Sequence, residues 1–360
     1  MIKIFTRLFI GLLLLSTAQN LLAQDIHFSQ FYSSPLTLNP AMTGNIAEHF
    51  RANFTYRNQW ASIPAPYSTV AASVDASLLG CQLGVDHVGV GLAIYNDRSG
   101  DGTLNDVTAL ASVAYHKGID SERKYMLSLG GQVGFTQKSI DITKLFFESQ
   151  IQAGLQPDLS APNMEPFQNN NFNYVDFRAG GLFTGAPSPD VNFYLGLGYF
   201  HLTKPTETFL DPDLESTADK VLDPRLVVHG GGSFFVNEQF SLSPSALFMS
   251  QTGARDVVAG LAAGYHFDQG GSRYRRSRGG SRASADASAI YLGAWYRLQD
   301  AVIVNIGVDY QRFKFGFSYD INISDLRTAS LGQGALELTL SYSNILTECR
   351  RRTPTYCPRF

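Results

Sequence analysis

"RANFTYRNQW", residues 51–60, decides the fold, because its polar and apolar residues alternate almost without a break. Successive side chains of an extended chain point to opposite faces. One face carries Arg51, Asn53, Thr55, Arg57 and Gln59, and the other carries Ala52, Phe54, Tyr56 and Trp60. A soluble β-sandwich would bury the aromatic face, whereas a membrane barrel would turn it to lipid and enclose the arginines.

The same alternation recurs along the chain in segments of about ten residues, each bounded by Asn, Asp, Gly, Ser or Pro. Fourteen strands are predicted, at residues 50–60, 67–79, 87–96, 105–117, 124–137, 173–184, 190–202, 225–236, 239–250, 255–267, 287–298, 301–311, 313–322 and 335–345. A sandwich has only about seven to nine strands. The sequence therefore predicts an all-β fold, a transmembrane antiparallel β-barrel of fourteen strands over residues 50–345, whose closure removes unpaired sheet edges.

The residues before the first strand divide into two parts. Residues 1–23 have two basic residues, a short apolar run and small residues before a plausible cleavage site, which is typical of a secretory signal peptide. Residues 24–49 contain Pro35, Pro40 and Gly44, which preclude a long helix. We expect an extended segment that is either periplasmic or a plug of the barrel. Residues 346–360 are expected to form a periplasmic tail.

The charge of the chain bears on nucleic-acid binding, and its cysteines bear on disulfide formation. Removal of the signal peptide leaves 26 basic and 31 acidic residues, so nothing indicates a nucleic-acid partner. Cys349 and Cys357 are expected to form a disulfide in an oxidising compartment, the alternative being two free thiols in a frayed tail. Cys81 is expected to be a lone thiol.

The loops follow the barrel prediction with one exception. An even number of strands assigns the long connections to the outer side and most short turns to the periplasm. The arginine-rich insertion 268–286 falls on the periplasmic side, so it is either a contact element or a flexible linker, or the strand count slips by one before it. Aromatic residues near strand ends are expected to face the membrane interfaces, namely Trp60, Tyr67, Tyr199, Phe200 and Tyr342.

Motifs for chemistry are absent from the sequence. It contains no nucleophile elbow, phosphate-binding loop, dinucleotide fingerprint or zinc-protease motif. The acidic stretches 96–106 and 211–223 lack the register of an EF-hand, so solvated turns are the simpler interpretation. We expect a protein that is not an enzyme and that needs no metal or cofactor.

Several separated blocks resemble the PorP/SprF family of Bacteroidetes membrane proteins, which are associated with type IX secretion and gliding. The resemblance covers essentially the whole mature chain and rests on LNPA at 38–41, YRNQW at 56–60, LDPR at 222–225 followed by HGG at 229–231, YLGAWYR at 291–297, FSYD at 317–320 and CPRF at 357–360. The insertion 268–286 is not part of the family pattern.

This resemblance implies an outer-membrane barrel that helps to secrete and retain a surface protein bearing a type IX C-terminal sorting domain, commonly a large adhesin. Outer-membrane lipids and periplasmic components of the secretion system are further expected partners. The outer loops 138–172 and 203–224 are the expected docking surface, since loops carry recognition. Their expected aromatic anchors are Phe146, Phe147, Phe167 and Phe172; packing of these rings onto the barrel rim is the alternative.

Four charged residues on the polar faces of strands are expected to point into the lumen and form ion pairs there. They are Arg51, Arg57, Asp309 and Asp320. A rival hypothesis remains open at this stage, since a barrel of this size either conducts or is plugged. In that case the protein would be a passive channel or a transporter of hydrophobic substrates.

Overall fold

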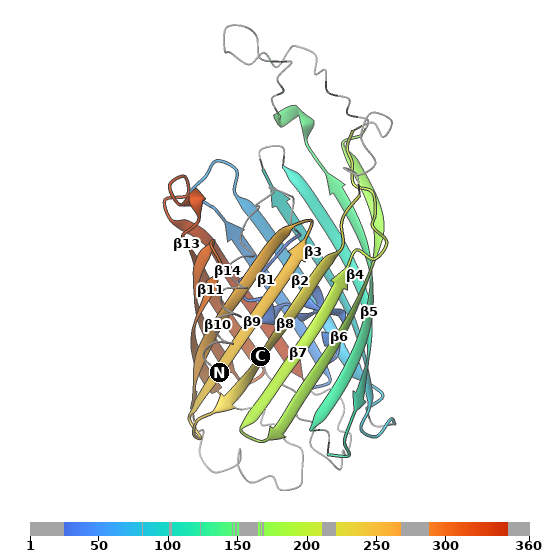
Figure 1. Ribbon diagram of the computed structural model, residues 1–360, viewed down its shortest axis with the longest axis vertical. Coiled ribbons are helices and arrows are strands. Elements are labelled where there is room, and N and C mark those ends of the chain that lie inside the picture. The colour runs from blue at the N-terminus through green and yellow to red at the C-terminus, as the bar shows by residue number, and fades with distance from the viewer. Residues whose placement is uncertain are drawn as a thin grey trace, which may run out of the picture.

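The computed structural model is a closed antiparallel barrel, in which each strand pairs with its neighbours in sequence and β1 pairs with β14 (Figure 1). It describes residues 25–80, 82–100, 103–122, 124–145, 147, 150, 165, 167, 169–210, 221–267 and 288–344. The closed antiparallel barrel confirms the predicted fold class.

All fourteen predicted segments are strands, and only their ends differ from the prediction. The strands are β1 (Phe50–Gln59), β2 (Tyr67–Leu78), β3 (His87–Ser99), β4 (Leu104–Gly118), β5 (Tyr125–Ser139), β6 (Asn171–Ser188), β7 (Val191–Phe200), β8 (Arg225–Phe235), β9 (Phe240–Gln251), β10 (Ala254–Phe267), β11 (Ser288–Arg297), β12 (Ala301–Tyr310), β13 (Phe313–Asn322) and β14 (Gln333–Asn344). The described residues also form short helical turns, η1 (Phe31–Ser33), α2 (Pro35–Leu38), η2 (Pro40–Met42), η3 (Ile142–Lys144) and η6 (Asp325–Arg327).

The two faces of the barrel wall differ in polarity as the alternation requires. Leu292 and Phe315 point outward and are 59% and 50% exposed, whereas Ser318 and Glu337 point inward and are fully buried. An outer surface of large apolar side chains is stable against acyl chains and not against water. The aromatic face of residues 51–60 therefore meets lipid, and its arginines are enclosed.

The two ends of the barrel are distinguished by the lengths of their connections (Figure 1). Residues 189–190 and 311–312 form short turns at the end where β1 begins, and the longest described connections leave the opposite end. Short turns face the periplasm and long loops face the exterior in outer-membrane barrels. The strand count does not slip, so the connection from β10 to β11 leaves the periplasmic end, although residues 268–286 lie outside the described part of the chain.

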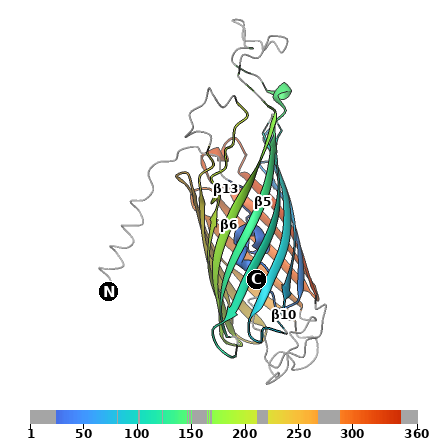
Figure 2. The ribbon, with the colours of Figure 1, turned by 90° about the vertical axis from the view of Figure 1, so that its right-hand side faces the viewer.

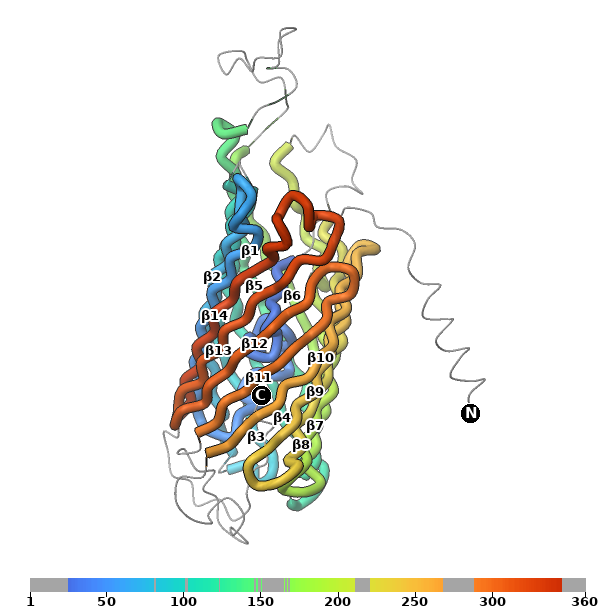
Figure 3. Tube along the Cα trace, turned by 90° about the vertical axis from the view of Figure 1, so that its left-hand side faces the viewer, coloured from blue at the N-terminus to red at the C-terminus, as the bar shows by residue number. Residues whose placement is uncertain are grey.

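One wall of the barrel is taller than the other at the outer end. β4 and β5 have 15 residues and β6 has 18, whereas β1, β7 and β11 have 10. Figure 2 shows β5 and β6 rising above the remaining wall, and Figure 3 shows the shorter strands β11 and β12 on the other side. This height difference gives the outer opening one raised side.

The expected interfacial aromatics divide into two groups. Tyr67 and Tyr199 are 38% and 40% exposed, and Trp60 packs edge-on against Tyr67 with ring centroids 5.2 Å apart. The expectation for Phe200 is wrong, because this residue is fully buried in the lumen. Tyr199 and Phe200 are adjacent in β7, so only one of the two can face lipid.

Among the residues that the structure describes, no helix has both the length and the apolar composition needed to cross a bilayer.

Candidate functional site

The residues before β1 lie inside the barrel, and we call residues 25–49 the plug. Blue turns of the plug are visible within the lumen in Figures 2 and 3. The segment is not extended, because Pro35 and Pro40 each begin a helical turn and Asn39 caps the second turn by accepting the N–H of Ala41 at 2.9 Å. Leu36, Asn39 and Ala41 are fully buried. The plug therefore fills the middle of the lumen.

Glycines in the barrel wall make room for the plug backbone. A Cβ on Gly130 of β5 would collide with the main chain of Pro40 and Ala41, and one on Gly89 of β3 would collide with the carbonyl of Thr43. Both glycines are required by this close approach and not by their backbone angles. The wall is therefore shaped to receive this particular segment.

Polar side chains of the wall bind the lower half of the plug. The Asn39 amide nitrogen donates to the carbonyl of Gly181 and lies within 3.0 Å of His229 Nε2. Gln132 donates to the Leu36 carbonyl at 3.1 Å. These groups are buried, so each contact satisfies a polar atom that water cannot reach.

The next part of the plug is bound through its turn into β1. The Thr43 hydroxyl donates to Ser112 at 3.0 Å, and the Thr43 carbonyl lies 2.8 Å from His116 Nε2. The Gly44 N–H donates to Asp75 Oδ2 at 2.8 Å, where a positive φ of 69° suits glycine. Side chains of β2 and β4 therefore hold the end of the plug that precedes β1.

An outer network of buried charges holds the upper part of the plug. The backbone N–H groups of Ser29 and Gln30 donate to the two oxygens of Glu337 at 2.8 and 2.9 Å. Arg57 lies 3.2 Å from Glu337 and 3.4 Å from Asp320. Arg297 adds a contact of 3.0 Å to Asp320. Paired charges and backbone donors together compensate the cost of burying these groups.

The other two charged residues predicted to line the lumen also meet partners of opposite charge. Arg51 forms an ion pair of 2.8 Å with Asp75, and Asp309 lies 3.7 Å from Lys314. The structure thus brings Arg57 and Asp320 together in one network and leaves Arg51 and Asp309 in separate pairs. Arg51 also donates to the Met42 carbonyl at 3.4 Å, so its pair touches the plug.

Sequence reasoning missed the partners of these residues, although strand register carried the signal. Arg57 stands directly opposite Glu337, Arg51 opposite Asp75 and Asp309 opposite Lys314 in neighbouring strands. Opposite charges at directly facing positions attract. Arg297 gave no such signal, because it reaches Asp320 across an intervening strand.

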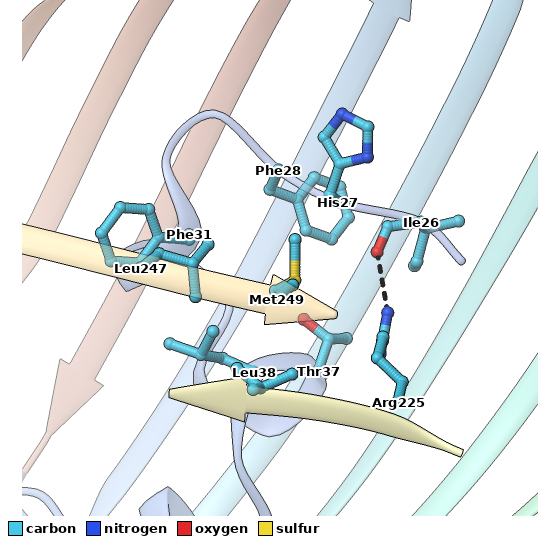
Figure 4. Close-up of a pocket in the computed structure, with 10 residues that line it drawn as sticks. Ile26, His27, Phe28, Phe31, Thr37, Leu38, Arg225, Leu247 and Met249 are labelled. Carbon is cyan, nitrogen blue, oxygen red and sulfur yellow. Dashed lines mark hydrogen bonds between the residues drawn. The ribbon is translucent and has the colours of Figure 1, made fainter. Parts of the chain in front are cut away.

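Apolar side chains fill the space between the plug and the β7–β12 wall. Phe31 and Leu38 of the plug pack in one buried cluster with Leu247 and Trp295 of the wall. A cavity of about 20 Å³ remains beside them, with room for about one water molecule. Figure 4 shows the side chains that line it, with Arg225 donating to the Ile26 carbonyl at 3.3 Å.

The described residues among the expected aromatic anchors pack against other aromatic rings. Phe147 and Phe167 are half-buried and pack edge-on against each other at 5.5 Å. Phe172 is not a loop residue, because it lies in β6 and packs at 4.7 Å against Phe209 of the β7–β8 connection. Phe146 lies outside the described residues, as do Cys81, Cys349 and Cys357. Rings of β6 and of the β5–β6 and β7–β8 connections therefore cluster on the taller wall.

Comparison with known proteins identifies the family of this plugged barrel. The family model described as "Type IX secretion system membrane protein PorP/SprF" matches residues 20–342. The chain belongs to the PorP/SprF family. As a closed barrel with an apolar outer belt, this PorP/SprF member is a multi-pass protein of the outer membrane.

Other comparisons of this PorP/SprF barrel extend to its fold alone. The Ralstonia pickettii toluene transporter TbuX matches with a TM-score of 0.48 and 12% sequence identity, over 88% of this chain and 94% of that chain. A Pseudomonas aeruginosa FadL homologue matches with a TM-score of 0.43 and 10% identity, over 85% of this chain and 92% of that chain. No protein of curated function matches the sequence significantly.

Proposed function

We propose that this PorP/SprF barrel supports the secretion and surface attachment of a partner protein with a type IX C-terminal sorting domain, without catalysing a reaction. Membership of the PorP/SprF family supports a role in type IX secretion. The observation that carries the proposal is the plug, whose buried Leu36, Asn39 and Ala41 occupy the lumen. A barrel filled by its own chain meets a partner through its loops, and such loops set specificity by shape and polarity.

The docking surface in this proposal is the raised outer rim, formed by the β5–β6 and β7–β8 connections. Phe147, Phe167, Phe172 and Phe209 gather there on one wall. Half-buried aromatic rings are suited to anchoring a partner because they add large apolar area at low entropic cost. A large adhesin is the partner we propose for this rim, which would connect the barrel with gliding.

Affinity purification of the tagged protein from its native outer membrane tests this proposal. We expect a large protein with a type IX C-terminal domain to co-elute with the wild type. Replacement of Phe167 by aspartate is expected to reduce its recovery, because the charge disrupts the ring cluster. Val236→Asp is the control, since this 66% exposed residue lies in the periplasmic turn between β8 and β9.

Two results would contradict the proposed function. One is that no such partner co-elutes from membranes in which the barrel is folded. The other is a steady open-channel current from the purified wild type in planar bilayers, which would favour the passive channel. Equal recovery with Phe167→Asp and Val236→Asp would remove the raised rim as the docking surface.

A further inference from the structure

The first residues of the plug cross the outer part of the lumen from wall to wall. Asp25 contacts the β6–β8 side through His201 and Arg225. Four residues later, Ser29 and Gln30 bond to Glu337 of β14, on the opposite side. Figure 4 shows Ile26, His27 and Phe28 along this crossing, above Leu38, Leu247 and Met249. We call residues 25–28 the bar.

The two ends of the bar are held by groups of different burial. At the end next to Ser29 and Gln30, the side chain of Glu337 is fully buried and that of Asp320 is 2% exposed. At the other end, the side chain of Asp25 is 18% exposed. Water therefore competes more easily for the contacts of Asp25 than for those of Glu337. The end of the bar at Asp25 is therefore held more weakly and is expected to open first.

His201 and Arg225 form a latch at that weaker end, where the Asp25 N–H also donates to Gln251 at 3.4 Å. His201 Nε2 lies 2.6 Å from Asp25 Oδ2, and Arg225 lies 3.3 Å from the same oxygen. Arg225 in turn stacks over the ring of Phe200, with its guanidinium carbon 4.4 Å from the ring centroid. Charge-assisted contacts of this kind are strong individually, so one side chain can decide whether the bar stays in place.

The latch side chains flank the β7–β8 connection. His201 is its first residue, and Arg225 is the first residue of β8. The same connection is tied to the raised wall by the Lys138–Glu207 ion pair of 2.7 Å and by the Phe172–Phe209 contact. A displacement of residues 201–210, the described stretch of this connection that begins at His201, would therefore move His201 away from Asp25.

The charges around His201 stabilise the closed latch. Asp25 of the plug and Asp176 of β6 face its imidazole, with Arg178 of β6 and Arg225 of β8 beyond them. Burial lowers the pKa of His201, but the carboxylates of Asp25 and Asp176 raise it above its ordinary value. Burial raises the pKa of Asp25, but Arg225 and His201 bring it below its ordinary value. The charged pair is thus present below the pKa of His201 and is lost as the pH rises through it.

We infer that the bar, residues 25–28, acts as a gate that is hinged at Ser29–Gln30. The contacts of Asp25 with His201 and Arg225 latch the bar beside the β7–β8 connection. The gate opens when that connection moves. Opening exposes the apolar lining of Leu38, Leu247 and Met249 while residues 39–45 of the plug stay in place. That a docked partner moves the connection rests on the proposed function. The hinge and the latch do not, and their test contains no partner.

Hydrogen–deuterium exchange of the full-length protein in detergent, followed by mass spectrometry, tests the gate. In His201→Gln, amides of residues 25–28 should exchange at least about tenfold faster, whereas those of residues 39–45 should keep their protection. Glu207→Gln, which loosens the connection without touching the plug, should give a smaller increase in the same residues. His266→Gln is the control, since His266 bonds Ser241 near the periplasmic end.

A pH series separates the charge of the latch from its packing. After correction for intrinsic exchange rates, the bar of the wild type should lose protection as the pH rises through the pKa of His201, and His201→Gln should show no further loss. Unheated gel mobility verifies that each variant is a folded barrel. Unchanged exchange of the bar in His201→Gln, equal loss over residues 39–45, or no response to Glu207→Gln would overturn the inference.

Discussion

A Gly130→Leu variant is expected to fold as a barrel whose lumen conducts ions. The wild-type glycine lies against the backbone of Pro40 and Ala41, where even a Cβ has no room. A leucine side chain cannot move the β5 backbone, which is paired on both sides with β4 and β6, so the plug must move instead. Single-channel recordings in planar bilayers should show a conductance at least about tenfold above the wild type, because a barrel of this size is open when unfilled.

The neighbouring glycine supplies a matched control for this experiment. A Cβ on Gly131 meets no heavy atom within 4 Å, because this residue faces away from the plug. Gly131→Leu should therefore conduct no more than the wild type. If both variants stay closed, or if both open, contact between Gly130 and the plug does not close the lumen.

Glu337→Gln is expected to destabilise the barrel strongly, although the two side chains have nearly the same shape. The change removes the nearer of two carboxylate partners of the buried Arg57 guanidinium and leaves it the Asp320 contact of 3.4 Å, and it weakens the acceptor of two plug N–H groups. Removal of one partner from a buried ion pair costs about 3–5 kcal/mol of unfolding free energy. Urea unfolding of the protein in lipid vesicles measures this loss.

Asp309→Asn is the control on the same side of the barrel. Its partner Lys314 lies 3.7 Å away, and their side chains are 20% and 34% exposed. A pair of this exposure contributes about 0–1 kcal/mol. Similar losses for Glu337→Gln and Asp309→Asn would mean that the outer network does not hold the plug in a buried environment.

The sequence predicts the barrel well because every strand needs apolar residues on its lipid face and polar residues on its lumen face. Residues 301–311 are predicted as one strand, and β12 covers Ala301–Tyr310. Such a pattern is local, so it can be identified without knowledge of the partners of a strand. Phe200 shows the limit: composition favours the membrane interface for an aromatic residue, but its position in the alternation directs it to Arg225 in the lumen.

The path of the plug could not be predicted, since it depends on contacts between distant parts of the chain. Asn39 reaches His229, which is 190 residues away, and the wall makes room for the plug with Gly130, which looks like an ordinary strand glycine. The prolines correctly excluded a long helix but did not indicate short turns. Register could have paired Arg57 with Glu337, but it contains no information about Ser29, which joins them from the plug.

Disulfide trapping between Thr43→Cys and Ser112→Cys tests most directly whether the plug fills the lumen. The two hydroxyl oxygens are 3.0 Å apart, so cysteines at these positions are close enough to react. With the native cysteines replaced by serine, peptide mass mapping of protein taken from the outer membrane should show this bond in most molecules. Two free thiols in a folded, membrane-inserted barrel would contradict the account.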